Sequence, residues 1–344
     1  MSTITPVVLC GGSGTRLWPR SRKANPKPFI DLVGSASLFK QALERCNGPD
    51  VFADPVIVAG AHHVPLIEQQ LGTEHPYALV VEPMARNTAP AIALAASVLD
   101  PDDIMLVCPS DHHIADPQAF QKAAQSAAEL ARDNWLVSFG IQPDRPETGY
   151  GYIERGDPLQ GGFAVKKFVE KPDLAKAEQF LASGGFAWNG GIFAFRAGQF
   201  LAELAAHRPE MASAIAASMD GAARDGLSIK PDAEAFAAIN GESVDYAVME
   251  NTARAAMVPV AMGWSDIGNW AAVHDALDTD GEGNAAAPQH QLEQCQDVLV
   301  VSDTKRVSAV GLEGVCIIVD GDDVLVISKD AAQLVGTLNG PKSQ

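Results

Sequence analysis

The sequence is poor in positive charge. It has 25 Lys and Arg against 43 Asp and Glu among 344 residues, a formal net charge of −18. This balance argues against nucleic acid or an anionic membrane surface as a partner, so we expect neither. An anionic small molecule is still compatible with it, because a few well-placed bases can hold a phosphate.

Cysteine is also scarce, and the cysteines form no CxxC pair. Scattered thiols of this kind are typical of small apolar residues in a reducing compartment. No uncharged apolar run reaches membrane-spanning length, and no signal-peptide pattern opens the chain. We expect a soluble, cytoplasmic protein. The cysteines are Cys10, Cys46, Cys108, Cys295 and Cys316.

Hydrophobic residues make up 47% of the chain, enough for a large core. Short apolar runs alternate with segments of helical periodicity, which predicts an α/β fold with a Rossmann-like, mostly parallel sheet covered on both faces. The predicted strands are 5–10, 55–60, 78–82, 103–111 and 135–141, and the predicted helices are 37–46, 64–71, 88–99 and 117–133.

The pattern changes near residue 149. Two alternating strands, a helix over 173–184 and a strand over 188–196 are followed by an alanine-rich helical stretch from 197 to about 250. A polar linker over 278–292 precedes short β runs separated by Gly and Asp. We therefore predict a large α/β domain over 1–277 and a small β-rich, β-helix-like domain over 293–344.

A glycine cluster follows the first predicted strand. Its backbone N–H groups are suited to phosphate. A P-loop would need Lys after Gly14, and a dinucleotide fingerprint would need Gly in place of Leu17, so both motifs are absent. The cluster and the bases after it favour a polyphosphate site: Gly11, Gly12, Ser13, Gly14, Thr15, Arg16, Arg20, Arg22, Lys23 and Lys27.

The segment GGSGTRLWP, with PKP after it, resembles the signature of the sugar-1-phosphate nucleotidyltransferases. The Trp18-Pro19 variant is most similar to the bacterial mannose-1-phosphate guanylyltransferases (GDP-mannose pyrophosphorylases). Seven further blocks occur in family order, and the resemblance as a whole covers most of the chain, including its β-rich tail. The blocks are EPMARNTAPAIALAA, PSDHHI, TGYGYI, FVEKP, WNGGIF, DYAVME and WSDIGNW.

The resemblance implies transfer of GMP from GTP to mannose 1-phosphate, giving GDP-mannose and pyrophosphate. The reaction is an in-line displacement assisted by Mg²⁺. Asp111 lies at the end of an apolar strand, and the carboxyl ends of parallel strands open onto the ligand crevice. Asp266 lies in the block WSDIGNW. The family uses these positions as metal ligands. Each Asp could also cap the helix that follows it.

The resemblance also assigns the other site residues. Arg16 and the loop would hold the leaving phosphates, with Lys27 nearby, and Lys171 would contact the sugar phosphate. The segment 82–88 resembles the base-recognition loop. The predicted nucleotide contacts are Gly11, Gly12, Ser13, Gly14, Thr15, Arg16, Glu82, Arg86, Asn87 and Thr88. The predicted sugar-phosphate contacts are Gly149, Gly151, Glu170, Lys171 and Asn189.

Three positions depart from the family pattern. Pro28 replaces a common Gln, Gly190 replaces a Ser near the sugar, and Asn251 replaces a Lys, which removes one expected positive contact. His112 and His113 are neighbours on a predicted strand, so they point to opposite faces and suit supporting roles better than one metal ion.

Two other functions fit the residues. One is the same reaction with UTP or dTTP and a glucose-type phosphate, and the other is a non-catalytic sugar-nucleotide-binding regulator. Longer relatives carry an isomerase domain of the cupin type, and we expect transferase activity only. A homodimer is expected.

Overall fold

The computed structural model describes residues 3–12, 14–72 and 76–342. The chain forms two compact units, each built from separate stretches of sequence. Unit 1 comprises Met1–Gly11, Ala42–Ser110 and Asp116–Trp264, and unit 2 comprises Gly12–Gln41, Asp111–Ala115 and Ser265–Gln344. These units do not follow the predicted boundary at 277, because the glycine loop shares its core with the C-terminal β strands.

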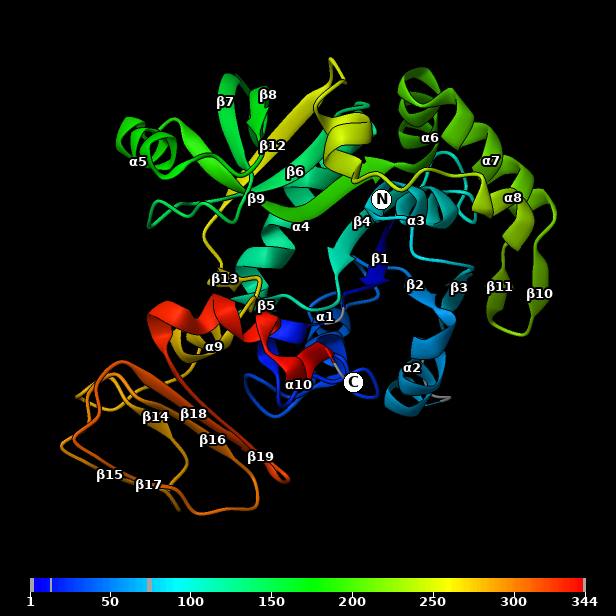
Figure 1. Cartoon of the computed structure of the whole chain (residues 1–344). Helices are drawn as coiled ribbons and strands as arrows, with labels where there is room; N and C mark the ends of the chain where they lie inside the picture. Colours follow the sequence, from blue (N-terminus) through cyan, green and yellow to red (C-terminus); the bar gives the residue numbers. More distant parts are fainter. Residues whose placement is uncertain (1–2, 13, 73–75, 343–344) are drawn as a thin grey trace. The chain divides into compact units, whose positions relative to one another are not determined.

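Unit 1 contains an 11-stranded sheet in the order β10-β11-β3-β2-β1-β4-β9-β6-β12-β8-β7 (Figure 1). The strands are β1 (Ile4–Cys10), β2 (Val56–Gly60), β3 (Ala78–Glu82), β4 (Ile104–Pro109), β6 (Leu136–Ile141), β7 (Tyr152–Leu159), β8 (Gly162–Val169), β9 (Phe186–Arg196), β10 (Ala223–Asp225), β11 (Ser228–Lys230) and β12 (Ala255–Val260).

The α/β prediction is confirmed, but the sheet is mixed rather than mostly parallel. Strands β1 to β4 pair in parallel, as their apolar runs predict. Strand β9 then runs antiparallel to both β4 and β6. The β7–β8 hairpin is antiparallel too, in agreement with the alternating character of its sequence.

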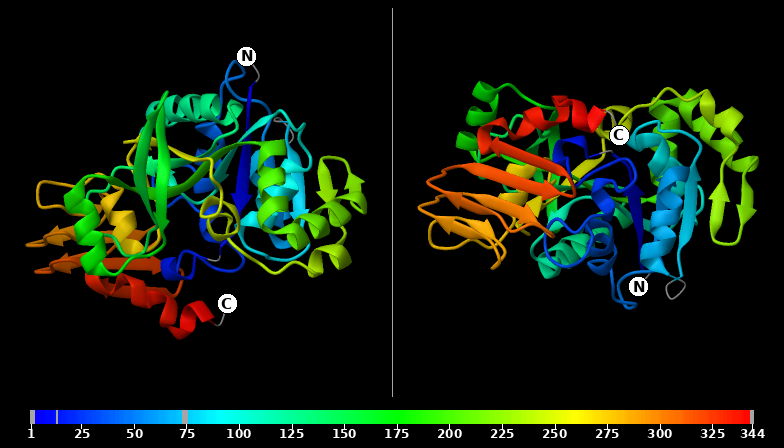
Figure 2. Two further views of the ribbon diagram at one scale, coloured as in Figure 1. Left: turned by 90° about the horizontal axis from the view of Figure 1, so that it is seen from above. Right: turned by 60° about the horizontal axis from the view of Figure 1, so that its bottom comes forward.

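Helices cover both faces of the sheet (Figures 1 and 2). Helix α3 packs on β1, β2 and β3, whereas α4 packs on β4, β6, β9 and β12. The unit 1 helices are η3 (Ala61–His63), α2 (Val64–Leu71), α3 (Thr88–Ala96), α4 (Pro117–Arg132), α5 (Leu174–Ser183), α6 (Ala197–His207), α7 (Pro209–Asp220), α8 (Ala233–Ala237) and the π-helix η4 (Asp245–Met249).

The predicted continuous helical stretch from 197 is wrong in its middle. After α7, the short hairpin β10–β11 turns at Gly226, whose φ is +57°. Strand β11 then pairs in parallel with β3. Alanine content favours helix, but an available sheet edge and a glycine turn outweigh it here.

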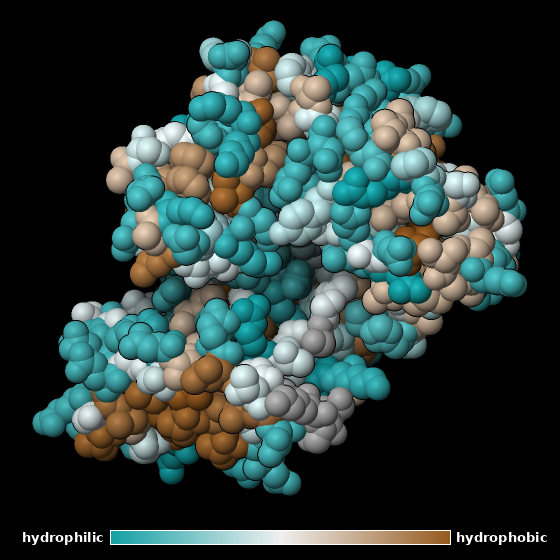
Figure 3. Space-filling view, turned by 45° about the horizontal axis from the view of Figure 1, so that its top comes forward, coloured by the Kyte–Doolittle hydropathy of each residue, from teal (hydrophilic) through white to brown (hydrophobic). Residues whose placement is uncertain are grey.

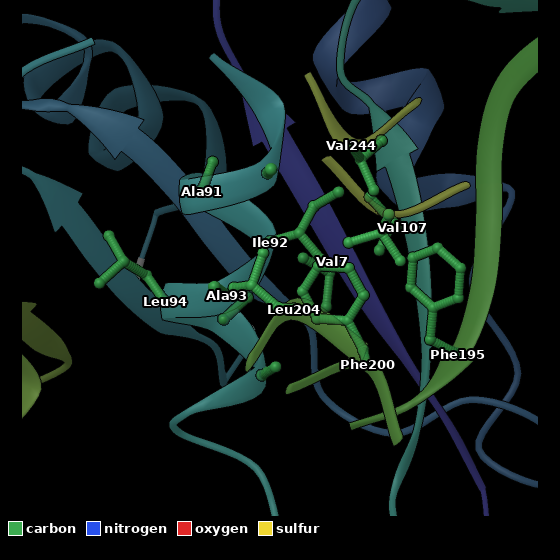
Figure 4. Close-up of a cluster of buried hydrophobic side chains, with 14 of the residues drawn as sticks. Val7, Ala91, Ile92, Ala93, Leu94, Val107, Phe195, Phe200, Leu204 and Val244 are labelled. Carbon is green, nitrogen blue, oxygen red and sulfur yellow. The ribbon is translucent and has the colours of Figure 1, made fainter. Parts of the chain in front are cut away.

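The main core of unit 1 lies between α3, α6 and one face of the sheet. Val7 and Val107 from the strands meet Ile92 of α3 and Leu204 of α6, with Phe195 beside them (Figure 4). Helix α3 is apolar all round and its residues 89–96 are buried, as expected for a helix enclosed by other elements. This packing fixes the carboxyl ends of β3 and β4, where predicted site residues follow.

Unit 2 joins the glycine loop to a small solenoid. Strands β14, β16 and β18 pair in parallel, and so do β15 and β17 on another side. This pattern confirms the β-helix-like tail. The elements are η1 (Thr15–Leu17), η2 (Lys27–Phe29), β5 (His113–Ile114), α9 (Trp270–Asp275), β14 (Ala285–Ala286), β15 (Gln291–Glu293), β16 (Leu299–Ser302), β17 (Ser308–Val310), β18 (Val315–Asp320), β19 (Asp323–Ser328), η5 (Lys329–Thr337) and α10 (Asn339–Lys342).

The residues 278–292, predicted as a linker, contribute β14 and the start of β15 to this solenoid. Two further elements, α1 (Leu38–Glu44) and β13 (Trp264–Ser265), span unit boundaries. The core of unit 2 brings Leu17 of the glycine loop together with Trp270, Leu299 and Val335.

The surface of the β-rich tail carries several exposed large apolar side chains, including Val324 and Val326 of β19. Apolar surface gathers over this tail at the lower left of Figure 3. All five cysteines are buried with free thiols, as predicted. Across the described ranges, no helix has both the length and the apolar character needed to span a membrane.

Candidate active site

The predicted site residues separate into two groups, one in each unit. The triphosphate and metal residues lie in unit 2, except Gly11, and the base and sugar residues lie in unit 1. Ser13 falls outside the described residues.

The glycine turn of unit 2 leaves its backbone uncovered. Gly12 has a φ of +86°, and a Cβ there would meet nothing within 4 Å. Gly14 also has positive φ, and its added Cβ would lie 2.5 Å from Lys27 Cβ and 2.7 Å from Ser21 Oγ. Only glycine allows this approach without displacement of its neighbours. The turn therefore packs tightly against the Lys27 segment while its Gly12 side stays open.

Lys27 joins the two predicted metal residues. Its Nζ donates to Asp111 Oδ2 at 2.7 Å and to the main-chain oxygen of Asp266 at 2.5 Å. The residue is buried, with Pro28 fixing the turn η2 directly after it. One ammonium thus brings the Asp111 and Asp266 segments together, although they are far apart in the sequence.

The Asp111 carboxylate is held in its charged form. Burial alone would raise its pKa, but the charges of Lys27 and His112 outweigh burial and the pKa lies below its ordinary value. His112 Nε2 lies 3.9 Å from Asp111 Oδ1, and His113 Nδ1 lies 3.4 Å from the side-chain oxygen of Gln41. The two histidines therefore have different neighbours.

Asp266 occupies a tight and strained turn. Its Oδ1 accepts from the backbone N–H of Gly268 at 3.1 Å. Ile267, between them, has a φ of +45°, which is rare for a β-branched residue and is found where surrounding structure overrides backbone preference. A Cβ at Gly268 would lie 2.9 Å from Asp266 Oδ2 and 3.3 Å from Arg16 Nη2, so Arg16 and Asp266 flank the same glycine.

The pair Asp111 and Asp266 is compatible with Mg²⁺ in its donor chemistry. Mg²⁺ takes one or two carboxylates from protein and completes its shell with water and substrate phosphate oxygens. Within the described ranges, no group of three or more His, Cys, Asp or Glu side chains gathers as a metal site. A site held by three or more such side chains is therefore absent from these ranges, whereas two carboxylates are enough for a Mg²⁺ ion that keeps water and phosphate ligands.

Two other bases after the turn, Arg20 and Arg22, bind acids of the same unit. Arg20 donates to Asp303 and to Asp31, and Arg22 donates to Asp320 and Asp323 at 2.9 Å each. These arginines anchor the loop to the solenoid. The local excess of positive charge seen in the sequence is thus partly neutralised by distant carboxylates.

In unit 1, Glu82 ends strand β3 with an unusual carboxyl group. Its Oε1 is buried and has no hydrogen-bond partner in the described part of the chain. Burial raises the pKa of Glu82 to about 7. A buried acceptor without a donor is costly, so a ligand that donates to it would be favoured.

The side chains of Arg86, Asn87 and Thr88, in the loop after Glu82, form hydrogen bonds within the protein. Asn87 has a φ of +70° and its side chain caps α3 by accepting from Thr88 N at 2.9 Å. Thr88 Oγ1 accepts from Val244 N, and Arg86 donates to the carbonyl of Ala237 at 2.9 Å. These contacts fix the loop that follows Glu82.

Four of the predicted sugar residues form one cluster in unit 1: Gly151, Glu170, Lys171 and Asn189. A Cβ at Gly151 would lie 2.7 Å from Glu170 Oε2 and 3.5 Å from Asn189 Cβ, so glycine permits their approach. Lys171 Nζ lies 3.0 Å from Glu170 Oε1, and the hydrogen bond and charge of Glu170 raise the pKa of Lys171. Gly149 donates its N–H to Glu147 at 2.8 Å.

Asp245 is a functional candidate that sequence reasoning did not assign. Asn189 Nδ2 donates to Asp245 Oδ1 at 2.7 Å, while Asn189 Oδ1 accepts from Ser138 Oγ at 2.9 Å. Burial raises the pKa of Asp245. The hydrogen bond from Asn189 lowers it and the charge of Glu170 raises it, and the net pKa lies above the ordinary value. Asp245 lies in the π-helix η4, a rare element that often marks functional sites. The DYAVME block was the available signal.

Two departures from the family pattern have structural explanations. A Cβ at Gly190 would lie 3.1 Å from Ile141 Cγ1, so a side chain there would require a shift. Asn251 Nδ2 donates to the carbonyl of Tyr246 at 2.7 Å and so caps the π-helix.

Residues 5–283 match the family described as "Nucleotidyl transferase". The xanthan biosynthesis protein XanB of Xanthomonas campestris pv. campestris (strain B100) is 44% identical over 97% of this chain and 72% of its own length. The mannose-1-phosphate guanylyltransferase of Escherichia coli (strain K12) is 40% identical over 96% of this chain and 72% of its own length.

A solved structure from Thermus thermophilus, described as a mannose-1-phosphate geranyltransferase, agrees over the whole fold. It superimposes with a TM-score of 0.89 at 30% identity and covers 99% of this chain and 100% of its own. The match over residues 5–283 and the relatives at 40% identity or more lead to one conclusion: the chain belongs to the nucleotidyl transferase family.

Proposed function

We propose that this protein transfers GMP from GTP to α-D-mannose 1-phosphate, forming GDP-mannose and pyrophosphate. The observation that carries the proposal is the Lys27 contact, which joins the Asp111 and Asp266 segments beside the glycine turn. The names of the E. coli and T. thermophilus relatives support mannose 1-phosphate as the substrate.

In the proposed reaction, a phosphate oxygen of mannose 1-phosphate attacks the α-phosphorus of GTP. The bond from that phosphorus to the bridging oxygen of the β-phosphate breaks, and pyrophosphate leaves with the electron pair. Catalysis of this step depends mainly on positioning and charge neutralisation. The backbone at Gly12 and the guanidinium of Arg16 would hold the β- and γ-phosphates.

We propose Mg²⁺ as the cofactor, held by Asp111 and Asp266. When bound, it would neutralise phosphate charge. Lys27 keeps Asp111 ionised and holds the main chain of Asp266 beside it. In unit 1, Lys171 would neutralise the sugar phosphate, and Glu170 would accept from sugar hydroxyl groups.

Glu82 supports guanine as the base. A carboxylate accepts from the N1–H and the exocyclic N2–H₂ donors of guanine, which lie side by side on one edge of the base. The buried and unpartnered Oε1 of Glu82 lacks such donors in the described part of the chain. Binding of guanine would remove the desolvation cost and return the pKa of Glu82 toward its ordinary range.

The experiment is a panel of GTP, ATP, UTP and dTTP against mannose and glucose 1-phosphates, with pyrophosphate release measured with Mg²⁺ and with a chelator. GTP with mannose 1-phosphate should give the highest kcat/KM, and the chelator should abolish turnover. A better rate with UTP or dTTP would overturn the substrate assignment, and binding of GDP-mannose with no turnover on any pair would favour a regulator. A cytoplasmic location and a homodimer are also part of this proposal, and sedimentation velocity tests the dimer.

A further inference from the structure

The C-terminal segment, residues 329–342, packs on the glycine loop of the same unit. Its helix η5 contacts η1, and α10 contacts η1 as well. A Cβ at Gly336 would lie 3.3 Å from Arg16 Cγ, and a Cβ at Gly340 would lie 2.8 Å from the Trp18 ring. Glycine at both positions allows the segment to approach the loop this closely.

The contact at Arg16 is specific. Gln333 Oε1 accepts a hydrogen bond from Arg16 Nη1 at 2.6 Å. The other terminal nitrogen, Nη2, is the one that lies 3.3 Å from the Cβ position of Gly268, beside Asp266. Because a guanidinium is planar with its donors in a fixed fork, holding one terminal nitrogen sets the direction of the others.

The chemical character of this partner differs from that of the neighbouring bases. Arg20 and Arg22 pair with carboxylates, which cancel their charge. Gln333 is a neutral amide, so it orients Arg16 and leaves its positive charge available to an anion. An arginine held in advance loses less side-chain entropy when a phosphate binds, and this improves affinity.

We propose that Gln333 is a positioning residue for the triphosphate, acting through Arg16, and that the C-terminal segment thereby forms part of the nucleotide-binding loop. This inference rests on the proposed function, which assigns Arg16 to the leaving phosphates. It extends that function by giving the β-rich tail a part in GTP binding through Arg16.

The test compares Gln333→Met, which keeps side-chain length and removes the acceptor, with Gln333→Glu, which keeps an acceptor and adds a negative charge. Gln291→Met is the control, because Gln291 is exposed on the same unit and its amide oxygen accepts from Ser308. GTP affinity is measured by calorimetry without sugar phosphate, and both KM values are measured by pyrophosphate release.

Gln333→Met should weaken GTP binding about three- to tenfold, the range of one ordinary net hydrogen bond, because only the prior orientation of Arg16 is lost. Gln333→Glu should weaken it further, since its charge opposes the phosphates. The KM for mannose 1-phosphate and the thermal midpoint should match those of the Gln291→Met control. In an Arg16→Met background, Gln333→Met should have no added effect.

Unchanged GTP affinity in Gln333→Met would overturn the inference, and so would an equal loss in the Arg16→Met background. Tighter binding would overturn it too, because the contact would then compete with the nucleotide. Failure of the wild-type protein to bind GTP or release pyrophosphate would instead refute the proposed function, so the two failures are distinguishable.

Discussion

Replacing Lys27 by Met removes the cation between the Asp111 carboxylate and the Asp266 main chain. The side chains of Lys27 and Asp111 are 8% and 24% exposed. Breaking a fully buried pair costs about 3–5 kcal/mol. Partial exposure of Asp111 lets water solvate the remaining charge, so we expect a loss of about 2–3 kcal/mol in the free energy of unfolding. That loss corresponds to roughly 3–5 °C in thermal midpoint for a protein of this size.

The pH dependence of the stability loss distinguishes an unpaired Asp111 charge from a general loss of packing. In the wild-type protein the pKa of Asp111 is lowered, so the pair stabilises the fold above the unfolded-state pKa and is lost as pH falls through the folded-state value. In Lys27→Met, burial dominates and raises the pKa of Asp111. The loss in the free energy of unfolding is therefore greatest at neutral pH, where Asp111 is charged, and vanishes when Asp111 is protonated. The difference in midpoint between wild type and Lys27→Met should narrow from pH 7 to pH 4.

Thermal unfolding followed by circular dichroism measures this difference, with Lys23→Met as the control because Lys23 is exposed on the same loop. Adding Asp111→Asn to Lys27→Met removes the unpaired charge and should restore part of the stability at pH 7. A difference that stays constant with pH, or a double variant no more stable than Lys27→Met, would refute the reasoning.

Three other variants test separate parts of the site. Asp111→Asn should lower turnover at least about 100-fold with far-UV circular dichroism unchanged, because it removes a charged metal ligand; wild-type kinetics would contradict the metal role. Glu82→Gln should raise the thermal midpoint at pH 8 but not at pH 4. The folded-state pKa of Glu82, about 7, lies above its unfolded-state pKa, so the charged carboxylate destabilises the fold increasingly as pH rises between the two pKa values. Equal shifts of the midpoint at pH 4 and pH 8 would contradict this. Lys171→Met should raise the KM for mannose 1-phosphate about tenfold with little change in the KM for GTP, since one phosphate contact is lost; a matching rise for GTP would argue against a sugar-phosphate role.

Local sequence predicted much of the molecule because the relevant physics is local. The apolar runs at Val7 and Val107 became buried strands, and α3 and α4 formed where periodicity placed them. The turn at Gly14 has no room for a side chain, and glycine is the residue at that position in the sequence. The hairpin β10–β11 was missed because its pairing depends on the edge of β3, a strand far earlier in the chain that local propensity does not register.

The sequence by itself determined the strand-and-glycine loop and the family blocks, including those that contain Asp111 and Asp266, because each consists of residues that are neighbours in the chain. Only the tertiary structure decided the partners of the charged groups: Lys27 with Asp111, Arg16 with Gln333, and Asn189 with Asp245. Such pairs leave no periodic pattern in the sequence. They form because burial leaves each polar group with the few partners that the folded core brings within hydrogen-bond distance.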